Sequence, residues 1–186
     1  MSLTQIITLA ILALLIFWAV GAYNRLVRLR SAVVQAFGGL DAHLVRWLAM
    51  LGEFDAAQVT AGTLDRHARS LLQGATTQLT ACLAVARARP LKADAVAALS
   101  AACAVVDTVW PTLLPDADAD DNHRRMAPWR ARWDELRTHN EQAARIFNDA
   151  VTHYNARIAQ FPAMLLAWIF GFTPARVLSI AREGNS

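Results

Sequence analysis

The aspartates between positions 116 and 121 have the spacing in this chain that comes closest to a known chemistry. Asp116, Asp118 and Asp120 alternate as carboxylate ligands do in a calcium-binding loop. A twelve-residue loop that starts at Asp116 places Asp121 where the sharp turn requires glycine, and Ala127 where a glutamate should complete the coordination. We therefore expect a solvated acidic turn whose last members cap the following helix, and no metal site.

No other pattern in the sequence indicates catalysis or a cofactor. The five histidines are dispersed and form no i, i+4 pair: His43, His67, His123, His139 and His153. The chain has no GxSxG nucleophile motif, no glycine-rich phosphate loop and no dinucleotide-binding fingerprint. We therefore expect a protein that is not an enzyme and that has no catalytic, cofactor-binding or metal-binding residues.

The composition restricts the class of protein further. Of the 186 residues, 55% are hydrophobic and 18% are charged, with only 8 Gly and 6 Pro. This excludes a disordered or collagen-like chain. All but one of the 18 basic residues are arginines, scattered along the chain without a basic stripe interleaved with aromatic residues, so a nucleic-acid partner is not expected.

The first 24 residues contain no charged side chain, and residues 3–23 are almost entirely apolar. As a helix, this segment reaches about 30 Å, the thickness of the hydrocarbon core of a bilayer. Trp18 and Tyr23 lie toward one end of it, where amphipathic rings favour the membrane interface. The pattern predicts a single-pass transmembrane anchor over residues 1–24, with the lipid bilayer as a partner.

The charge that follows the anchor predicts its orientation. Arg25, Arg28 and Arg30 come directly after it, and no acidic residue precedes Asp41. Because arginine-rich flanks stay in the cytoplasm, we expect the N-terminus outside and residues 25–160 inside as a cytoplasmic helical domain. A cleaved signal peptide is the alternative, but it would need positive charge before a shorter apolar run.

Apolar residues at gaps of three and four predict four long helices after the anchor. The first continues the anchor to about residue 51, and the others cover about 59–88, 96–110 and 124–161. Their short connections predict an all-α fold, an antiparallel bundle with coiled-coil-like packing. Gly38 and Gly39 predict a kink or a close helix crossing, and Cys82 and Cys103 are expected to be buried, free thiols in a reducing compartment.

Several motifs resemble the pattern of LemA family proteins. They are Tyr23-Asn24-Arg25-Leu26-Val27, Leu40-Asp41, Ala86-Arg87, Phe147-Asn148-Asp149-Ala150-Val151, Tyr154-Asn155, Phe161-Pro162 and Phe170-Gly171-Phe172. The resemblance implies a bacterial, membrane-anchored bundle of long helices with no established enzymatic activity. It also implies an association with envelope-maintenance proteases. The chain departs from the family pattern at Trp47, Arg137 and Ala144.

The polar residues of the last long helix have two interpretations. Asn148, Tyr154 and Asn155 would either present polar groups to a partner or fix the helix register within the bundle. Since Asn148 and Asn155 are seven residues apart, they lie on one helix face. A buried contact with Tyr23 and Asn24 is one form of the second interpretation.

Residues 161–172 form an uncharged, strongly apolar segment at the start of the C-terminal region 161–186. At about 18 Å as a helix, the segment is too short to cross a bilayer. It would either insert Trp168, Phe170 and Phe172 at headgroup depth, with Arg176 and Arg182 near anionic lipid, or pack over the bundle end.

Together these observations predict a non-catalytic, membrane-anchored interaction or scaffold protein, with a membrane or membrane-associated protein as partner. Self-association is compatible with the pattern. The alternative is a periplasmic helical sensor or ligand-binding domain, which requires the opposite topology and a polar pocket between helices.

Deleting residues 1–24 should leave a soluble and mainly helical protein, because the remaining apolar stripes can bury one another without lipid. Circular dichroism of the fragment 25–186 tests this expectation. A spectrum dominated by coil would contradict it.

Overall fold

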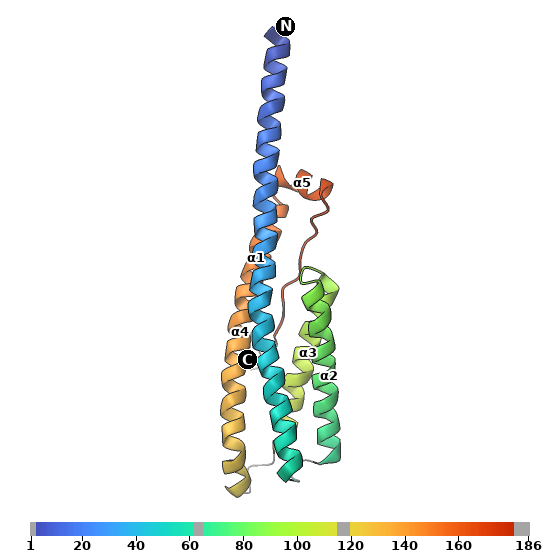
Figure 1. Ribbon diagram of the computed structural model, residues 1–186, viewed down its shortest axis with the longest axis vertical. Coiled ribbons are helices and arrows are strands. Elements are labelled where there is room, and N and C mark those ends of the chain that lie inside the picture. The colour runs from blue at the N-terminus through green and yellow to red at the C-terminus, as the bar shows by residue number, and fades with distance from the viewer. Residues whose placement is uncertain (1–2, 62–64, 115–119, 181–186) are drawn as a thin grey trace, which may run out of the picture.

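The computed structural model describes residues 3–61, 65–114 and 120–180, and over these ranges the regular secondary structure is helical, without a strand (Figure 1). The helices are α1 (Leu3–Ala61), α2 (Arg66–Ala88), α3 (Ala93–Thr112), α4 (Asp120–Ile158) and α5 (Ala163–Ile169). The predicted all-α bundle, with a long apolar N-terminal helix, is confirmed.

Helix α1 is a single helix of 59 residues. Its first third projects beyond the other helices, with nearly every side chain exposed (Figure 1). Within the described ranges, two helices are long and apolar enough to cross a membrane. They differ in burial, because the apolar window of α1 is 0% buried and that of α3 is 39% buried as part of the bundle.

Three details of the helix predictions are wrong. α1 runs without a break through Gly38 and Gly39, both exposed, and a Cβ added at either would meet nothing within 4 Å, so no close crossing occurs there. α1 also continues to Ala61 and therefore includes Val59, which the sequence placed in the next helix. Phe161 lies beyond the end of α4.

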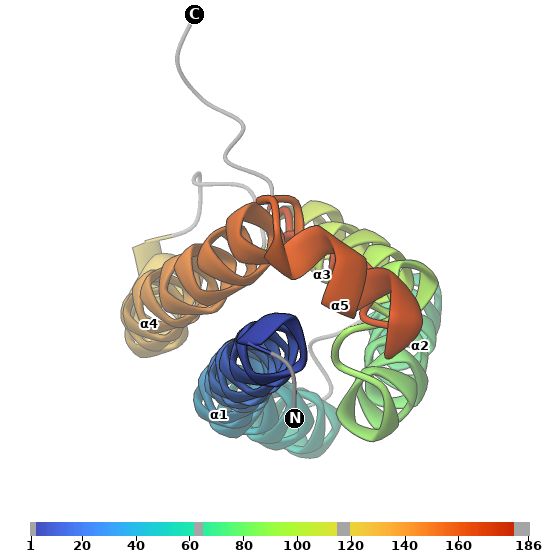
Figure 2. The ribbon, with the colours of Figure 1, turned by 90° about the horizontal axis from the view of Figure 1, so that it is seen from above.

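Helix α1 packs against α4 on one side and α2 on the other, and α2 packs against α3 (Figure 2). The backbones of α3 and α4 do not approach each other closely anywhere in the described ranges. Large side chains bridge this space at the end of the bundle away from α5, which we call the far end. There the Trp110 and Trp133 rings stack with centroids 4.5 Å apart. Phe54 and Trp47 pack against this pair at 5.1 Å and 5.0 Å.

At the opposite end, which we call the α5 end, the space between α3 and α4 holds an extended segment instead. Residues 171–180, the C-terminal tail, run from α5 back along the bundle between these helices (Figure 1). Ala175 and Leu178 of the tail are buried. The four long helices are therefore closed into one core by aromatic rings at the far end and by the tail at the α5 end.

Some of the sequence predictions fall outside the described residues. Residues 116–119 of the aspartate run and Arg182 lie there, and the side chains of Asp120, Asp121 and Asn122 are not described either. The expected acidic turn and helix cap therefore stay predictions.

Both cysteines are free thiols, and they lie on neighbouring helices. Cys103 is buried, which raises the pKa of its thiol to about 12, and nearby Asp107 and Cys82 act in the same direction. A thiol with so high a pKa is a poor nucleophile, so Cys103 acts as a small core residue.

Asp107 is the most perturbed carboxylate among the described residues. Its side chain is 11% exposed and lies 3.8 Å from the Arg137 guanidinium. Burial raises the pKa of Asp107 to about 6; Arg137 opposes the rise and Glu141 adds to it. Since the folded state holds this proton up to about pH 6, the group lowers stability as pH rises from about 4 to about 6.

Asp107→Asn should therefore increase the free energy of unfolding by about 1–3 kcal/mol at pH 8, and the gain should fall toward zero at pH 4. Arg137 would keep Glu141, 3.5 Å away on the same helix. Denaturant unfolding at the two pH values measures the effect, with Asp134→Asn as a matched exposed control. An equal change at both pH values would contradict the assignment.

Candidate interaction site

Two asparagines of α4 hold the C-terminal tail by its backbone. The Asn148 side-chain amide donates to the Leu178 carbonyl oxygen at 2.8 Å, and its Oδ1 accepts from the Leu178 N–H at 2.7 Å. Asn155 makes the same two bonds with Ala175, at 2.8 Å and 2.9 Å. Each asparagine therefore satisfies both backbone groups of one tail residue. We call this arrangement the asparagine ladder.

The spacing of the two partners explains why the ladder fits. Asn148 and Asn155 are seven residues apart, about 10.5 Å along a helix. Ala175 and Leu178 are three residues apart, about 10 Å along an extended chain. Because these two distances match, a straight helix and an extended tail that runs in the opposite direction can be joined at both asparagines without distortion.

Two further bonds fix the ends of the tail. The Tyr154 hydroxyl donates to the Thr173 carbonyl oxygen at 3.0 Å, and the backbone N–H of Ser179 donates to Ser100 Oγ on α3 at 3.2 Å. Burial raises the pKa of the Tyr154 phenol, so it stays a donor at neutral pH. The tail is thus bonded to both helices between which it lies.

The reversal of the chain between α5 and the tail depends on Gly171. This glycine has a φ of +68°, a left-handed conformation that side chains with a Cβ rarely adopt. The Phe172 N–H donates to the Ala167 carbonyl oxygen at 2.9 Å, which closes the helix end in a Schellman-type arrangement. Tyr23 of α1 packs against Phe170 and Phe172, with ring centroids 4.8 Å and 6.2 Å apart.

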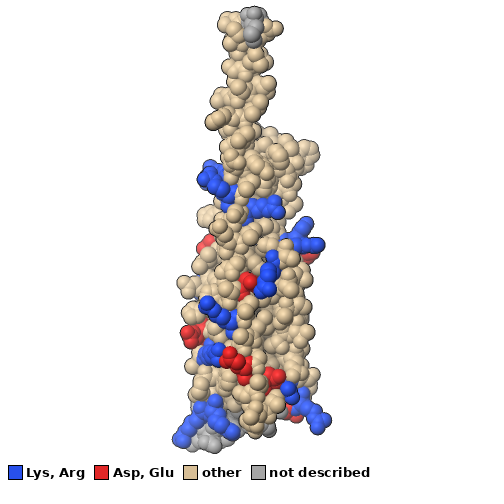
Figure 3. All heavy atoms as spheres, in the orientation of Figure 1, with Lys and Arg blue, Asp and Glu red and all other residues tan. Residues whose placement is uncertain are grey.

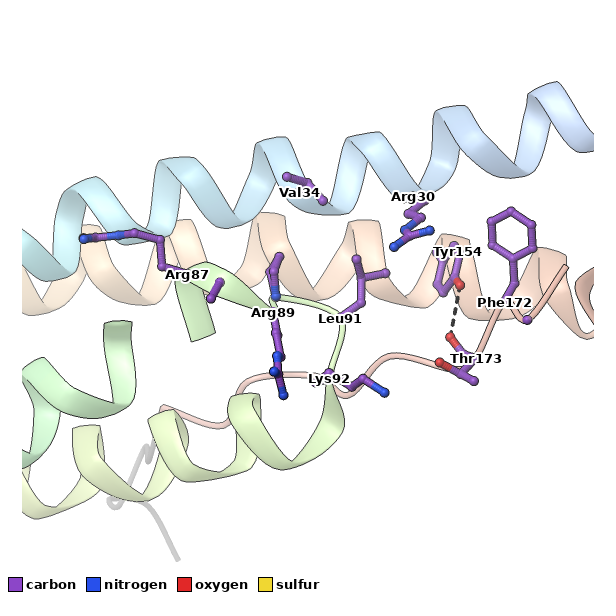
Figure 4. A pocket seen from close by; sticks show the side chains of 12 residues that line it. Arg30, Val34, Arg87, Arg89, Leu91, Lys92, Tyr154, Phe172 and Thr173 are labelled. Carbon is purple, nitrogen blue, oxygen red and sulfur yellow. Dashed lines mark hydrogen bonds between the residues drawn. The ribbon is translucent and has the colours of Figure 1, made fainter. Parts of the chain in front are cut away.

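A pocket of about 500 Å³ lies beside the tail, between α1, the α2–α3 turn and α4 (Figure 4). Four basic side chains line it: Arg30, Arg87, Arg89 and Lys92. The Arg87 guanidinium lies 2.8 Å from Asp41, and this hydrogen bond raises the pKa of Arg87. The other three form no ion pair with a carboxylate of the described residues, so the pocket carries net positive charge. We call it the basic pocket.

The tail itself forms one wall of the basic pocket. Tyr154, Phe172 and Thr173 line it opposite the α2–α3 turn, and Arg30 points from α1 toward Tyr154 (Figure 4). Helix α3 also begins at this pocket, because its N-cap residue, Lys92, lines it. The Lys92 side chain makes no capping hydrogen bond. The site therefore combines cations, an uncapped helix end and an apolar wall.

The structure brings most of the motif residues together at the α5 end. The ladder, Gly171 and the Tyr23 ring contacts form one continuous arrangement. Asn148 and Asn155 act within the bundle, but not through a contact with Tyr23 and Asn24, which was one form of the register interpretation. The asparagines bind the tail, and Asn24 is exposed.

The expected interface residues lie at the same end. Trp18 and Arg25 line a separate groove with the turn between α4 and α5, and Pro162 lies in that turn. Phe161 and Trp168 are 77% and 84% exposed. Arg28 is exposed on α1.

Sequence reasoning missed several residues of the site. Arg89, Lys92 and Ser100 carry no motif that marks them. The pair Arg87 and Asp41 could have been suspected, since both belong to segments that resemble the family pattern, but they are 46 residues apart.

The described residues contain no group of three or more His, Cys, Asp or Glu that could hold a metal ion. His43 and His139 lie side by side with ring centroids 5.8 Å apart. Burial lowers the pKa of His43, and the nearby Arg46 and His139 add to this effect.

The architecture defines the class of the protein: a bundle of long helices with an apolar helical extension and a C-terminal tail packed into the bundle. A family model for the LemA family matches residues 84–186, more than half of the chain. The chain belongs to the LemA family. No curated protein and no solved structure matches it significantly.

Removing a rung of the ladder should release the tail. Asn155→Ala and Asn148→Ala should each lower the free energy of unfolding by about 1–3 kcal/mol, because two buried backbone groups lose their partners. They should also speed tryptic cleavage after Arg176, which lies between the two rungs.

Asp149→Ala is the matched control, because Asp149 is an exposed neighbour on the same helix. It should change stability by less than about 0.5 kcal/mol and leave the cleavage rate unchanged. Equal cleavage in the wild type and in both asparagine variants would show that the ladder does not hold the tail.

Proposed function

We propose that this protein is a non-catalytic scaffold, anchored in a membrane, that holds a helical bundle against the cytoplasmic face for membrane or membrane-associated protein partners. Residues 3–24 cross the bilayer in this proposal, and α5 lies at the interface. The bundle and its polar site face the cytoplasm.

One contact carries the proposal. Tyr23 ends the uncharged apolar run of α1, and its ring lies 4.8 Å from that of Phe170 at the end of α5. The short helix is therefore at the level where the apolar projection stops. It lies across the end of the bundle rather than along it (Figures 1 and 2). This is the position and the direction expected of a helix lying in a membrane interface.

The exposed side chains of α5 and its flanks support the same placement. They are large and apolar, and they form one surface with the projecting part of α1: Phe161, Met164, Leu165, Trp168, Ile169 and Phe170. A contiguous apolar surface of this kind marks a contact with lipid or with another protein. Trp168, at 84% exposure, is its most exposed aromatic residue.

Charge supports the orientation. On the face in Figure 3 the projecting segment and the α5 region show no charged residues, and basic residues begin directly below them. Arg25, Arg28 and Arg30 are exposed in this zone. Arginines that flank a span favour the cytoplasmic side and are attracted to anionic lipid.

A binding role is supported by what the polar motif residues do. Asn148, Tyr154 and Asn155 use their side chains to hold the chain's own backbone. Such bonds engage these three side chains and build a fixed surface at the α5 end.

The basic pocket favours a second candidate, a ligand-binding helical domain on the other side of the membrane. Its volume of about 500 Å³ is within the range of small-molecule sites, and its uncompensated cations fit an anionic ligand. This function requires the bundle to lie outside the cytoplasm.

Topology separates the two candidates. If the protein is a cytoplasmic scaffold, a reporter that fluoresces only in the cytoplasm should be active when it is fused after Asn185. A phosphatase that works only outside the cytoplasm should be inactive at the same position. The reverse result would favour the ligand-binding candidate.

A variant with reversed flanking charge provides the control. Thr4→Arg and Gln5→Arg combined with Arg25→Gln, Arg28→Gln and Arg30→Gln moves the positive flank to the other side. It should shift a measurable share of the protein to the opposite orientation.

A further inference from the structure

A second concave surface lies at the α5 end, separate from the basic pocket. It is a groove of about 480 Å³ between α1 and the turn from α4 into α5. One wall comes from α1, with Phe17, Trp18, Gly21 and Arg25, and the other from residues 157–163. We call it the Arg25–Arg157 groove.

Both charged residues that line the groove are arginines, and no carboxylate lines it. Arg25 forms no ion pair with a carboxylate in the part of the chain that the structure describes. Arg157 is bonded at 3.0 Å to Gln160 Oε1, a neutral amide oxygen. Two uncompensated positive charges in one concave site attract an anion and repel a cation.

The groove also has an apolar part with a defined depth. Phe17 and Arg25 are eight residues apart on one helix, about 12 Å along its axis. When residues 3–24 span the bilayer, Phe17 lies within the hydrocarbon core and Arg25 lies just beyond it, at the level of lipid phosphates. The groove thus passes from acyl chains to headgroups.

Glycine keeps the apolar part open. A Cβ added at Gly21 would meet nothing within 4 Å, so a larger side chain there would extend into the groove without striking the protein. This position allows the groove to be filled without a change of charge.

We propose that the Arg25–Arg157 groove binds one anionic phospholipid, with its phosphate between Arg25 and Arg157 and an acyl chain along Phe17 and Gly21. This rests on the proposed membrane anchoring. Guanidinium groups form strong, directed bonds with phosphate. A zwitterionic lipid binds less well, because the groove offers no carboxylate for its ammonium group.

The test is native mass spectrometry of the full chain in non-ionic detergent, with added phosphatidylglycerol or with phosphatidylcholine of the same acyl chains. The wild type should retain one phosphatidylglycerol in preference to phosphatidylcholine. Arg25→Gln with Arg157→Gln should reduce that retention about tenfold, as the loss of two charge-assisted bonds predicts. Gly21→Leu should reduce it too, with all arginines kept.

Arg46→Gln with Arg66→Gln is the matched control, because it removes the same charge from exposed residues that lie outside the groove and away from the α5 end. It should retain phosphatidylglycerol as the wild type does. Equal retention by the wild type and by Arg25→Gln with Arg157→Gln would overturn the proposal, and so would an equal loss in the control.

Carbonate extraction of membranes from the cells that express the full chain separates the lipid-site proposal from the membrane anchoring on which it rests. Protein that is released by carbonate overturns the anchoring and the lipid site together. Protein that stays in the membrane and shows no preference for phosphatidylglycerol overturns the lipid site alone.

Discussion

The geometry of the α5 end depends on the hydrogen bonds between the asparagine ladder and the C-terminal tail. Helices α3 and α4 do not pack backbone to backbone, so the space between them must be filled. At the far end the stacked rings of Trp110 and Trp133 fill it. At the α5 end an extended chain does so, and an extended chain inside a helical bundle exposes unpaired N–H and C=O groups to an apolar core. Asn148 and Asn155 supply partners for them.

The position of α5 follows from this constraint. A tail fixed along α4 determines where the chain must leave α5, and Gly171 provides the reversal. The short helix is then held across the bundle end, where Phe170 meets Tyr23. The basic pocket gains one wall from the tail, and the Arg25–Arg157 groove gains one wall from the turn that leads into α5. Both candidate binding surfaces are therefore consequences of the way the tail is held.

The sequence predicted well whatever depends on local periodicity. Gaps of three and four identified the long helices, and a charge-free run identified the projecting segment. Both signals are local, because the spacing of apolar residues along the chain reflects which face of a helix is buried. The prediction from Gly38 and Gly39 was wrong because those residues lie on the exposed face of α1, where a glycine meets no neighbour. Helix ends were also misplaced, because α1 continues to Ala61 through residues 59–61, which are exposed and so carry no packing pattern that marks the helix end.

The site was harder to predict, for a physical reason. The sequence marked Asn148 and Asn155 as polar residues on one face, but their partners are the backbone groups of Ala175 and Leu178. Every residue carries the same backbone groups, so no side chain signals which ones will be bound. The basic pocket joins residues from four separate segments, and only the folded chain shows that Arg30 and Lys92 line one pocket.

The central claim is that the tail and α5 set the end of the bundle at the membrane surface. Spin labelling of the full chain in a bilayer tests it, with single cysteines at Trp168→Cys and, as a reference, at exposed Asp149→Cys, each in a chain with Cys82→Ala and Cys103→Ala. We predict that the label at position 168 is more accessible to oxygen than to a water-soluble nickel complex, and that the label at position 149 shows the reverse. Equal accessibility to the nickel complex at the two positions would contradict the account.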